Sequence, residues 1–210
     1  MAFDYKKEYK DIYLPPKKPQ LITVPPITYV AVKGKGDPNE EDGAYKRALQ
    51  LLYSISFTIK MSPKSGHDIE GYFQYVVPPL EGFWTTANNT LFDPKHKGKL
   101  TWISCIRLPE FVTPAVFTWA KEEIERKKNL DASAANMLTI DEGHCVQCMH
   151  IGPYDNEPPT IEAMKEYAEA QGFAIELSPS RWHHEIYLSD PRRAAPEKMK
   201  TVIRLPVAPA

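Results

Sequence analysis

The pattern of hydrophobic and polar positions predicts two copies of a β-α-β-β unit. A β-rich run begins each copy, at 27–32 and at 146–151, and turn residues follow it. Apolar residues then recur three to four positions apart, from 44 to 59 in the first copy and from 161 to 168 in the second, as in a helix packed on one face. Two more strand-like runs follow each helix, and they lie at 72–77, 100–108, 182–188 and 201–205.

The two copies are predicted to form one α+β domain by duplication. The last strand of each copy ends in the same four residues, Ile-Arg-Leu-Pro, at 106–109 and at 203–206. Two such units join their sheets edge to edge with the helices on one face, so we expect the opposite face to curve around a ligand where the halves meet. The expected boundaries are an N-terminal arm at 1–20 and a single domain at 21–210, with halves at about 21–130 and 140–210.

One segment, Trp182 to Leu188, places a carboxylate in an otherwise aromatic and apolar strand. Because side chains alternate between the two faces of a strand, His183, Glu185 and Tyr187 share one face. The other face has the bulk of a core, so Glu185 is expected to point away from the core. A carboxylate among aromatic rings requires a cation, a proton or a hydrogen-bond donor. The segment therefore predicts recognition of a cationic or electrophilic small molecule.

Each candidate residue also has a structural interpretation. Glu185 could be a structural carboxylate paired with a nearby arginine, and Trp84 and Tyr154 could be core or turn residues. His183 and Tyr187, which share the face of Glu185, favour the ligand role because an exposed strand face rarely combines these residue types. Trp84, which follows Gly82, is the tryptophan best placed to form an aromatic platform in a cleft. The sequence does not distinguish whether Trp102 faces the cleft or the core.

Composition excludes several classes of protein. Of the 210 residues, 42% are hydrophobic and 25% are charged, which is typical of a soluble globular protein. A net charge of -1 gives no support to direct nucleic-acid binding, which normally requires a basic face. The chain starts without an apolar signal segment, and its longest apolar-rich run, 48–59, is too short to cross a membrane. With an odd number of cysteines, the sequence predicts a cytoplasmic protein without a disulfide framework.

One cluster has the residue types of a zinc site, namely His144, Cys145, Cys148 and His150. All four lie in or just before one predicted strand, where neighbouring side chains point to opposite faces and cannot surround an ion. The sequence therefore predicts no metal and no cofactor. A metal site that joins His183 and Glu185 to the distant His150 is the alternative.

Five stretches of the chain carry a family resemblance. They are 79–84 (PLEGFW), 142–147 (EGHCVQ), 150–158 (HIGPYDNEP), 183–191 (HHEIYLSDP) and 200–204 (KTVIR). Through them the chain resembles the GyrI-like (gyrase-inhibitor-like) small-molecule-binding family, which includes the effector-binding domains of multidrug-responsive transcription regulators. The resemblance extends from about residue 22 to about residue 206.

The resemblance implies a duplicated β-α-β-β fold with a ligand cleft between the halves. In the family a glutamate on a strand faces the cleft and pairs with cationic aromatic ligands, and Glu185 is the matching residue here. The aromatic lining would come from Trp84, Tyr154 and Tyr187. Many relatives carry two tryptophans where this chain has Phe83 and Trp84, which implies an aromatic platform of different size or shape.

Three functions are consistent with these residues. The first is polyspecific binding of amphipathic, often cationic aromatic compounds, with Glu185, Tyr187, Trp84, Tyr154 and His183 as ligand-binding residues. The second is a hydrolase that opens the cyclopropane ring of DNA-alkylating natural products. Some stand-alone family members look like such enzymes, and the resemblance implicates Glu185 and Trp84 in their chemistry. The third is the sensing of an effector for a partner transcription regulator.

Overall fold

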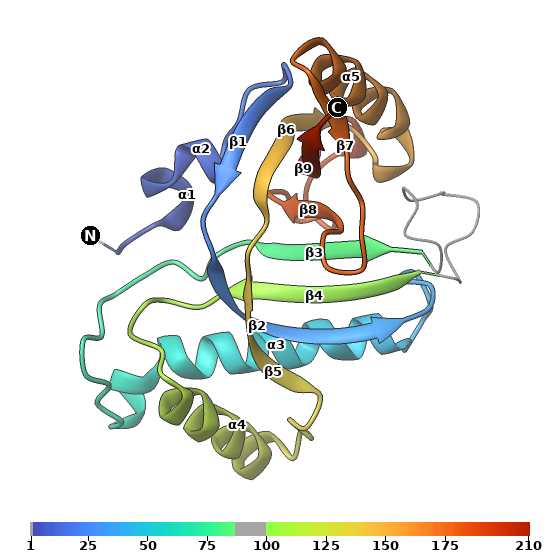
Figure 1. The fold of residues 1–210 in the computed structure, drawn as a ribbon. Helices are drawn as coiled ribbons and strands as arrows, with labels where there is room; N and C mark the ends of the chain where they lie inside the picture. Colours follow the sequence, from blue (N-terminus) through green and yellow to red (C-terminus); the bar gives the residue numbers. More distant parts are fainter. Residues whose placement is uncertain (1, 87–99) are drawn as a thin grey trace.

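An antiparallel sheet of nine strands forms the centre of the computed structural model, which describes residues 2–86 and 100–210 (Figure 1). The strands lie in the order β1-β6-β9-β8-β3-β4-β2-β5, and β7 pairs with β9. The strands are β1 (Gln20–Val24), β2 (Ile27–Lys35), β3 (Leu80–Thr85), β4 (Thr101–Arg107), β5 (Ala135–Ile140), β6 (Gly143–Ile151), β7 (Phe173–Ile175), β8 (His183–Tyr187) and β9 (Lys200–Pro209). The α-helices are α1 (Tyr5–Glu8), α2 (Lys10–Tyr13), α3 (Ala44–Lys60), α4 (Pro114–Lys128) and α5 (Pro158–Ala170). None of the helices in these ranges is long and apolar enough to cross a membrane.

The sheet order contains the duplication that the sequence predicts. Strands β6, β9 and β8 of the second half correspond to β2, β4 and β3 of the first, and the halves meet where β3 pairs with β8. The registers also match, because Ile106 lies opposite Leu80 in the first half and Ile203 lies opposite Glu185 in the second. The predicted α+β fold of two β-α-β-β units is therefore confirmed. Glu185 takes the place in the second half that Leu80 has in the first.

The first half differs from the prediction in its second strand. Residues 72–77 form no strand, and Tyr75 makes only an isolated bridge. Their rings pack around Phe111 instead, with centroid distances of 5.2 Å from Phe73 and 5.9 Å from Tyr75. The strand is β3, which starts after the two prolines at 78–79 because proline has no N–H to donate to a sheet.

Helices α3 and α5 cover one face of the sheet, α3 over β2 and β4 of the first half and α5 over the second half (Figure 1). Beneath α5 lie Val146, Cys148, Ile203 and Leu205, and Ile203 is the residue opposite Glu185. Helix α4 packs against α3. The N-terminal segment with α1 and α2 covers the other face, and a cavity of about 910 Å³ lies on the helix side. This cavity lies on the face that the helices cover, whereas the sequence led us to expect a ligand cleft on the opposite face.

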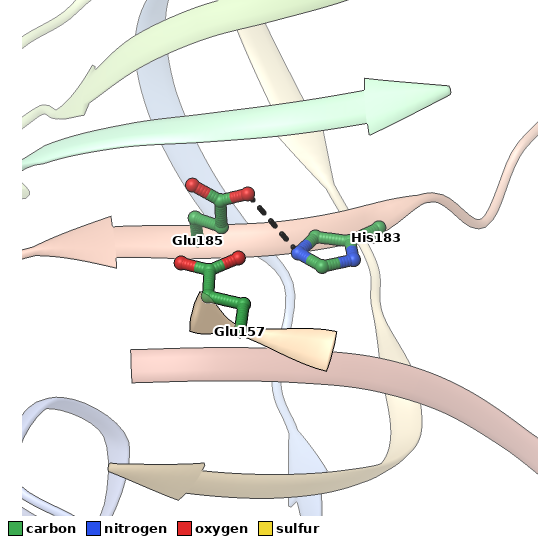
Figure 2. Close-up of side chains that lie close together, drawn as sticks. All are labelled: Glu157, His183 and Glu185. Atoms are coloured by element: carbon green, nitrogen blue, oxygen red, sulfur yellow. Dashed lines mark ion pairs between the residues drawn. The ribbon is translucent and has the colours of Figure 1, made fainter. Parts of the chain in front are cut away.

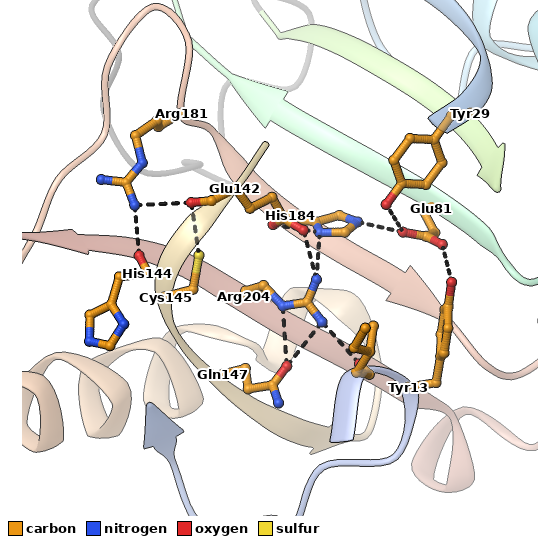
Figure 3. A network of polar contacts seen from close by, with 11 residues as sticks. Tyr13, Tyr29, Glu81, Glu142, His144, Cys145, Gln147, Arg181, His184 and Arg204 are labelled. Carbon is orange, nitrogen blue, oxygen red and sulfur yellow. Dashed lines mark hydrogen bonds and ion pairs between the residues drawn. The ribbon is translucent and has the colours of Figure 1, made fainter. Parts of the chain in front are cut away.

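A buried polar network holds the N-terminal segment against the sheet (Figure 3). At its centre, Glu142 Oε1 accepts a hydrogen bond from Arg204 Nη1 at 2.8 Å, and Glu142 Oε2 lies 2.9 Å from His184 Nδ1. The second nitrogen of His184 lies 3.0 Å from Glu81 Oε2. Arg204 Nη2 also donates to the carbonyl oxygen of Ile12 at 2.9 Å. The buried charges of this face therefore require the N-terminal segment as a partner.

The charges of the network determine one another's protonation. Burial by itself would raise the pKa of Glu142, but Arg204 and His184 outweigh it and lower that pKa to about 2. Burial would lower the pKa of His184, but Glu142 and Glu81 outweigh it and raise that pKa above the ordinary value. The network is thus most stabilising when His184 is protonated and Glu142 is ionised.

The network predicts how stability depends on pH. The contribution of His184 is complete below its ordinary pKa of 6.5 and is lost as the pH rises through the raised value. The contribution of Glu142 is complete above its ordinary pKa of 4.5 and is lost as the pH falls toward about 2. We expect the thermal unfolding midpoint to be highest between these two ordinary values and to fall on both sides. Replacement His184→Gln should flatten the alkaline decline, and an unchanged decline would assign it to another group.

Removal of the central carboxylate should be strongly destabilising. We expect Glu142→Gln to lower the free energy of unfolding by about 3–5 kcal/mol, because Arg204 and His184 stay buried without their shared counter-charge. Urea unfolding of wild type and variant measures the difference. The control is Glu123→Gln, which removes a carboxylate from an ion pair with Arg126 on the surface of α4 and should change stability little. Similar losses in both variants would contradict the central role of Glu142.

Candidate functional site

A cavity of about 910 Å³ lies on the helix-covered face, over the junction of β3 and β8. Its volume suits a drug-sized molecule. Leu80 and Glu185, the equivalent positions of the two halves, both line it. The aromatic residues of its wall are Tyr45, Tyr53, Phe57, Trp84, Tyr154 and Tyr187. The cavity therefore combines an aromatic lining with one buried carboxylate from the central strand β8.

Glu185 is held in this wall by the pairing of β8 with its neighbours. It lies between Gly82 of β3 and Ile203 of β9, and only 7% of the residue is exposed. Its Oε1 atom lies 3.2 Å from His183 Nε2. A carboxylate with so little access to water acts through a low dielectric, so its charge has a stronger effect on a ligand than a charge at the surface.

Trp84 and Tyr187 connect the two halves across the cavity wall. The indole Nε1 of Trp84 donates a hydrogen bond to the hydroxyl oxygen of Tyr187 at 2.9 Å. Gly82 makes this contact possible, because a Cβ atom there would lie 2.7 Å from Trp84 Nε1 and 2.9 Å from the Tyr187 hydroxyl. The ring of Tyr154 meets Tyr187 edge to face at a centroid distance of 5.6 Å, and the ring of Tyr45 lies 5.5 Å from Trp84.

The tyrosines of the wall keep their protons. Burial, followed by the nearby charge of Glu185, raises the pKa of Tyr187 well above the ordinary value. Burial and the same carboxylate raise the pKa of Tyr154 to about 12. Since the oxygen of Tyr187 accepts the N–H of Trp84, its own proton is available to Glu185 or to a ligand.

Two further buried side chains approach Glu185 (Figure 2), and neither of them lines the cavity. They are His183 and Glu157, and each is 1% exposed. Burial raises the pKa of Glu157 well above its ordinary value, and the carboxylates of Glu185 and Asp155 raise it further. The surroundings of Glu157 therefore favour the protonated form of its carboxyl group.

Glu157, His183 and Glu185 are the residues of the described part of the chain that could hold a metal ion. One donor atom from each lies within 4.8 Å of the other two. Glu157 was not among the residues expected from the sequence, because it directly precedes the Pro-Pro pair of α5 and resembles an ordinary residue at the start of a helix. The sequence feature that could have identified Glu157 is its position within 150–158, one of the five stretches that carry the family resemblance.

The structure places the other candidate residues away from this group. His150 lies 2.9 Å from the hydroxyl of Thr160 and 3.1 Å from the carbonyl oxygen of Pro153, so both of its nitrogens have partners. Trp102 is 1% exposed and packs edge to face against Tyr45 at 5.1 Å without lining the cavity. Trp182 is half-buried and lines a smaller cavity of about 350 Å³ on the other face.

The family profile of the GyrI-like small molecule binding domain matches residues 17–208. The chain belongs to the GyrI-like family. No curated protein sequence matches it. Within the GyrI-like family, the duplicated sheet and the cavity at its junction are therefore features of a small-molecule-binding domain.

Solved structures share the fold of this chain. The chain is 44% identical to a hydrolase from Listeria innocua, with a TM-score of 0.90 over 99% of this chain and 100% of that chain. It is 46% identical to an uncharacterized conserved protein from Listeria innocua, with a TM-score of 0.92 and the same coverage. The EcmrR C-terminal domain is 12% identical, with a TM-score of 0.52 over 92% of this chain and 98% of that domain, and this likeness is one of fold.

Proposed function

We propose that this GyrI-like protein binds amphipathic, cationic aromatic small molecules, with Glu185 as the counter-charge. The observation that carries the proposal is the buried carboxylate of Glu185 on the wall of an aromatic cavity of about 910 Å³. Aromatic faces attract a cation by about 0.5–2 kcal/mol each. Rings and a single charge set few directional demands, so such a site accepts several unrelated compounds.

Four basic residues also line the cavity, together with the acidic residues Asp155 and Asp190. Of these residues, Lys46 and Arg192 are exposed, Lys6 and Lys60 are half-buried, and Arg192 is paired with Asp190 at 2.9 Å. Charges in contact with water are screened by solvent and salt. The carboxylate of Glu185 is buried and has greater influence on the part of a ligand that reaches the sheet.

Fluorescence titration with several cationic dyes tests the binding function. We expect Glu185→Gln to weaken binding by about 2 kcal/mol or more, or about 30-fold, because the cation loses its buried counter-charge. The control is Glu166→Gln, which removes one negative charge from the exposed side of α5 and should leave affinity unchanged. An uncharged aromatic compound should bind both variants like wild type. Equal affinity of a dye for wild type and Glu185→Gln would refute the counter-charge.

A second candidate function is hydrolysis, and the 44% identity to a hydrolase from Listeria innocua favours it. In this proposal the substrate is a DNA-alkylating compound with a strained cyclopropane ring. Glu185 would act as a general base on a water molecule, while Trp84 and Tyr187 orient the electrophile in the cavity. The ring-opened product would contain one added water.

Mass spectrometry of a cyclopropane-containing alkylator incubated with the protein tests hydrolysis. We expect wild type to form a product heavier by one water and Glu185→Ala to form none above the buffer rate, since the variant lacks the base. Glu166→Gln should retain the full rate. If wild type binds the compound and leaves it intact, binding alone is the function.

A further inference from the structure

The group formed by Glu157, His183 and Glu185 has more ligating atoms than the counter-charge function uses. We propose that it binds one divalent transition-metal ion, which goes beyond the proposed function. One donor atom of each residue lies within 4.8 Å of the other two, and His183 Nε2 lies 3.2 Å from Glu185 Oε1. Metal bonds of about 2.0–2.2 Å to imidazole nitrogen and carboxylate oxygen would bring the most widely spaced of these atoms closer together.

Glu157 gives the independent reason to expect a cation here. Neither of its carboxylate oxygens has a hydrogen-bond partner among the described residues, although the residue is 1% exposed. It immediately precedes α5 without capping that helix, and its carboxylate points toward Glu185 (Figure 2). Two carboxylates in one buried space are costly unless a positive charge joins them.

The donors are held by regular structure, as a metal site requires. His183 and Glu185 stand two residues apart on the same face of β8, a strand paired on both sides. Glu157 precedes the Pro-Pro pair that begins α5, where the backbone has little freedom. The imidazole Nδ1 of His183 has no hydrogen-bond partner among the described residues, so no bond to that atom opposes ring adjustment toward an ion.

The donor set selects a class of ion. One imidazole nitrogen and two carboxylates suit Zn²⁺, Mn²⁺ or Fe²⁺, whereas Mg²⁺ prefers an all-oxygen shell. Because Glu185 also lines the cavity, the ion would lie at the cavity wall. It could there polarise an oxygen atom of a ligand or a water molecule.

Isothermal titration calorimetry of untagged, metal-free protein with Zn²⁺ and with Mn²⁺ tests this site. We expect one ion per chain and much weaker binding of Mg²⁺. Glu157→Gln and His183→Gln should each weaken Zn²⁺ binding by more than the roughly 10–100-fold that loss of an outer-shell partner costs. Glu166→Gln, with the same change of charge on the exposed side of α5, should bind Zn²⁺ like wild type.

Two further measurements distinguish loss of the metal site from loss of the fold. Circular dichroism and thermal unfolding show whether each variant folds, and either folded variant is enough for the test. The visible absorption of Co²⁺ added to wild type should change on binding to nitrogen and oxygen ligands. An unchanged Co²⁺ spectrum, or Zn²⁺ affinity that survives in a folded variant, would overturn the site and leave a proton as the neutralising charge. Dye binding is measured without metal, so failure of one proposal leaves the other intact.

Discussion

The antiparallel pairing of β3 with β8 is the contact on which both the fold and the site depend. It joins the two halves into one sheet and sets Gly82 opposite Glu185. The absence of a side chain at Gly82 lets Trp84 of one half hydrogen-bond to Tyr187 of the other. Alternation along the same two strands sends their remaining side chains to the opposite face. A change of register by one residue would therefore exchange the residues of the cavity with those of the core.

Because of this alternation, a residue of β8 that lines the cavity is followed or preceded by one that stabilises the fold. Glu185 lines the cavity, whereas His184 lies in the buried network between Glu142 and Glu81. The N-terminal segment completes that network through the carbonyl oxygen of Ile12. Strand β8 thus carries both a residue of the cavity wall and a residue of the buried polar network.

Much of the fold was readable from local pattern, because duplication repeats every local signal twice. The repeated Ile-Arg-Leu-Pro tetrapeptide occupies equivalent registers, and alternation in β8 places Glu185 and Tyr187 on one face. The strand expected at 72–77 was wrong, since its aromatic residues pack around Phe111. The local sequence pattern does not indicate which face of the sheet carries the cavity. The N-terminal segment covers the other face through contacts between residues far apart in the sequence, such as Arg204 and Ile12. Glu157 was not expected from the sequence either, since its proximity to β8 arises only in three dimensions.

The equivalence of Leu80 and Glu185 has a consequence for how a ligand lies in the cavity. Two identical units would have built a chamber with twofold symmetry, in which either end of an elongated molecule fits equally well. Here the strand register keeps that symmetry at the junction, while the side chains break it, since one half presents an apolar side chain where the other presents a carboxylate. The chamber consequently has a head and a tail, and a molecule with one charged end has a single preferred direction of entry.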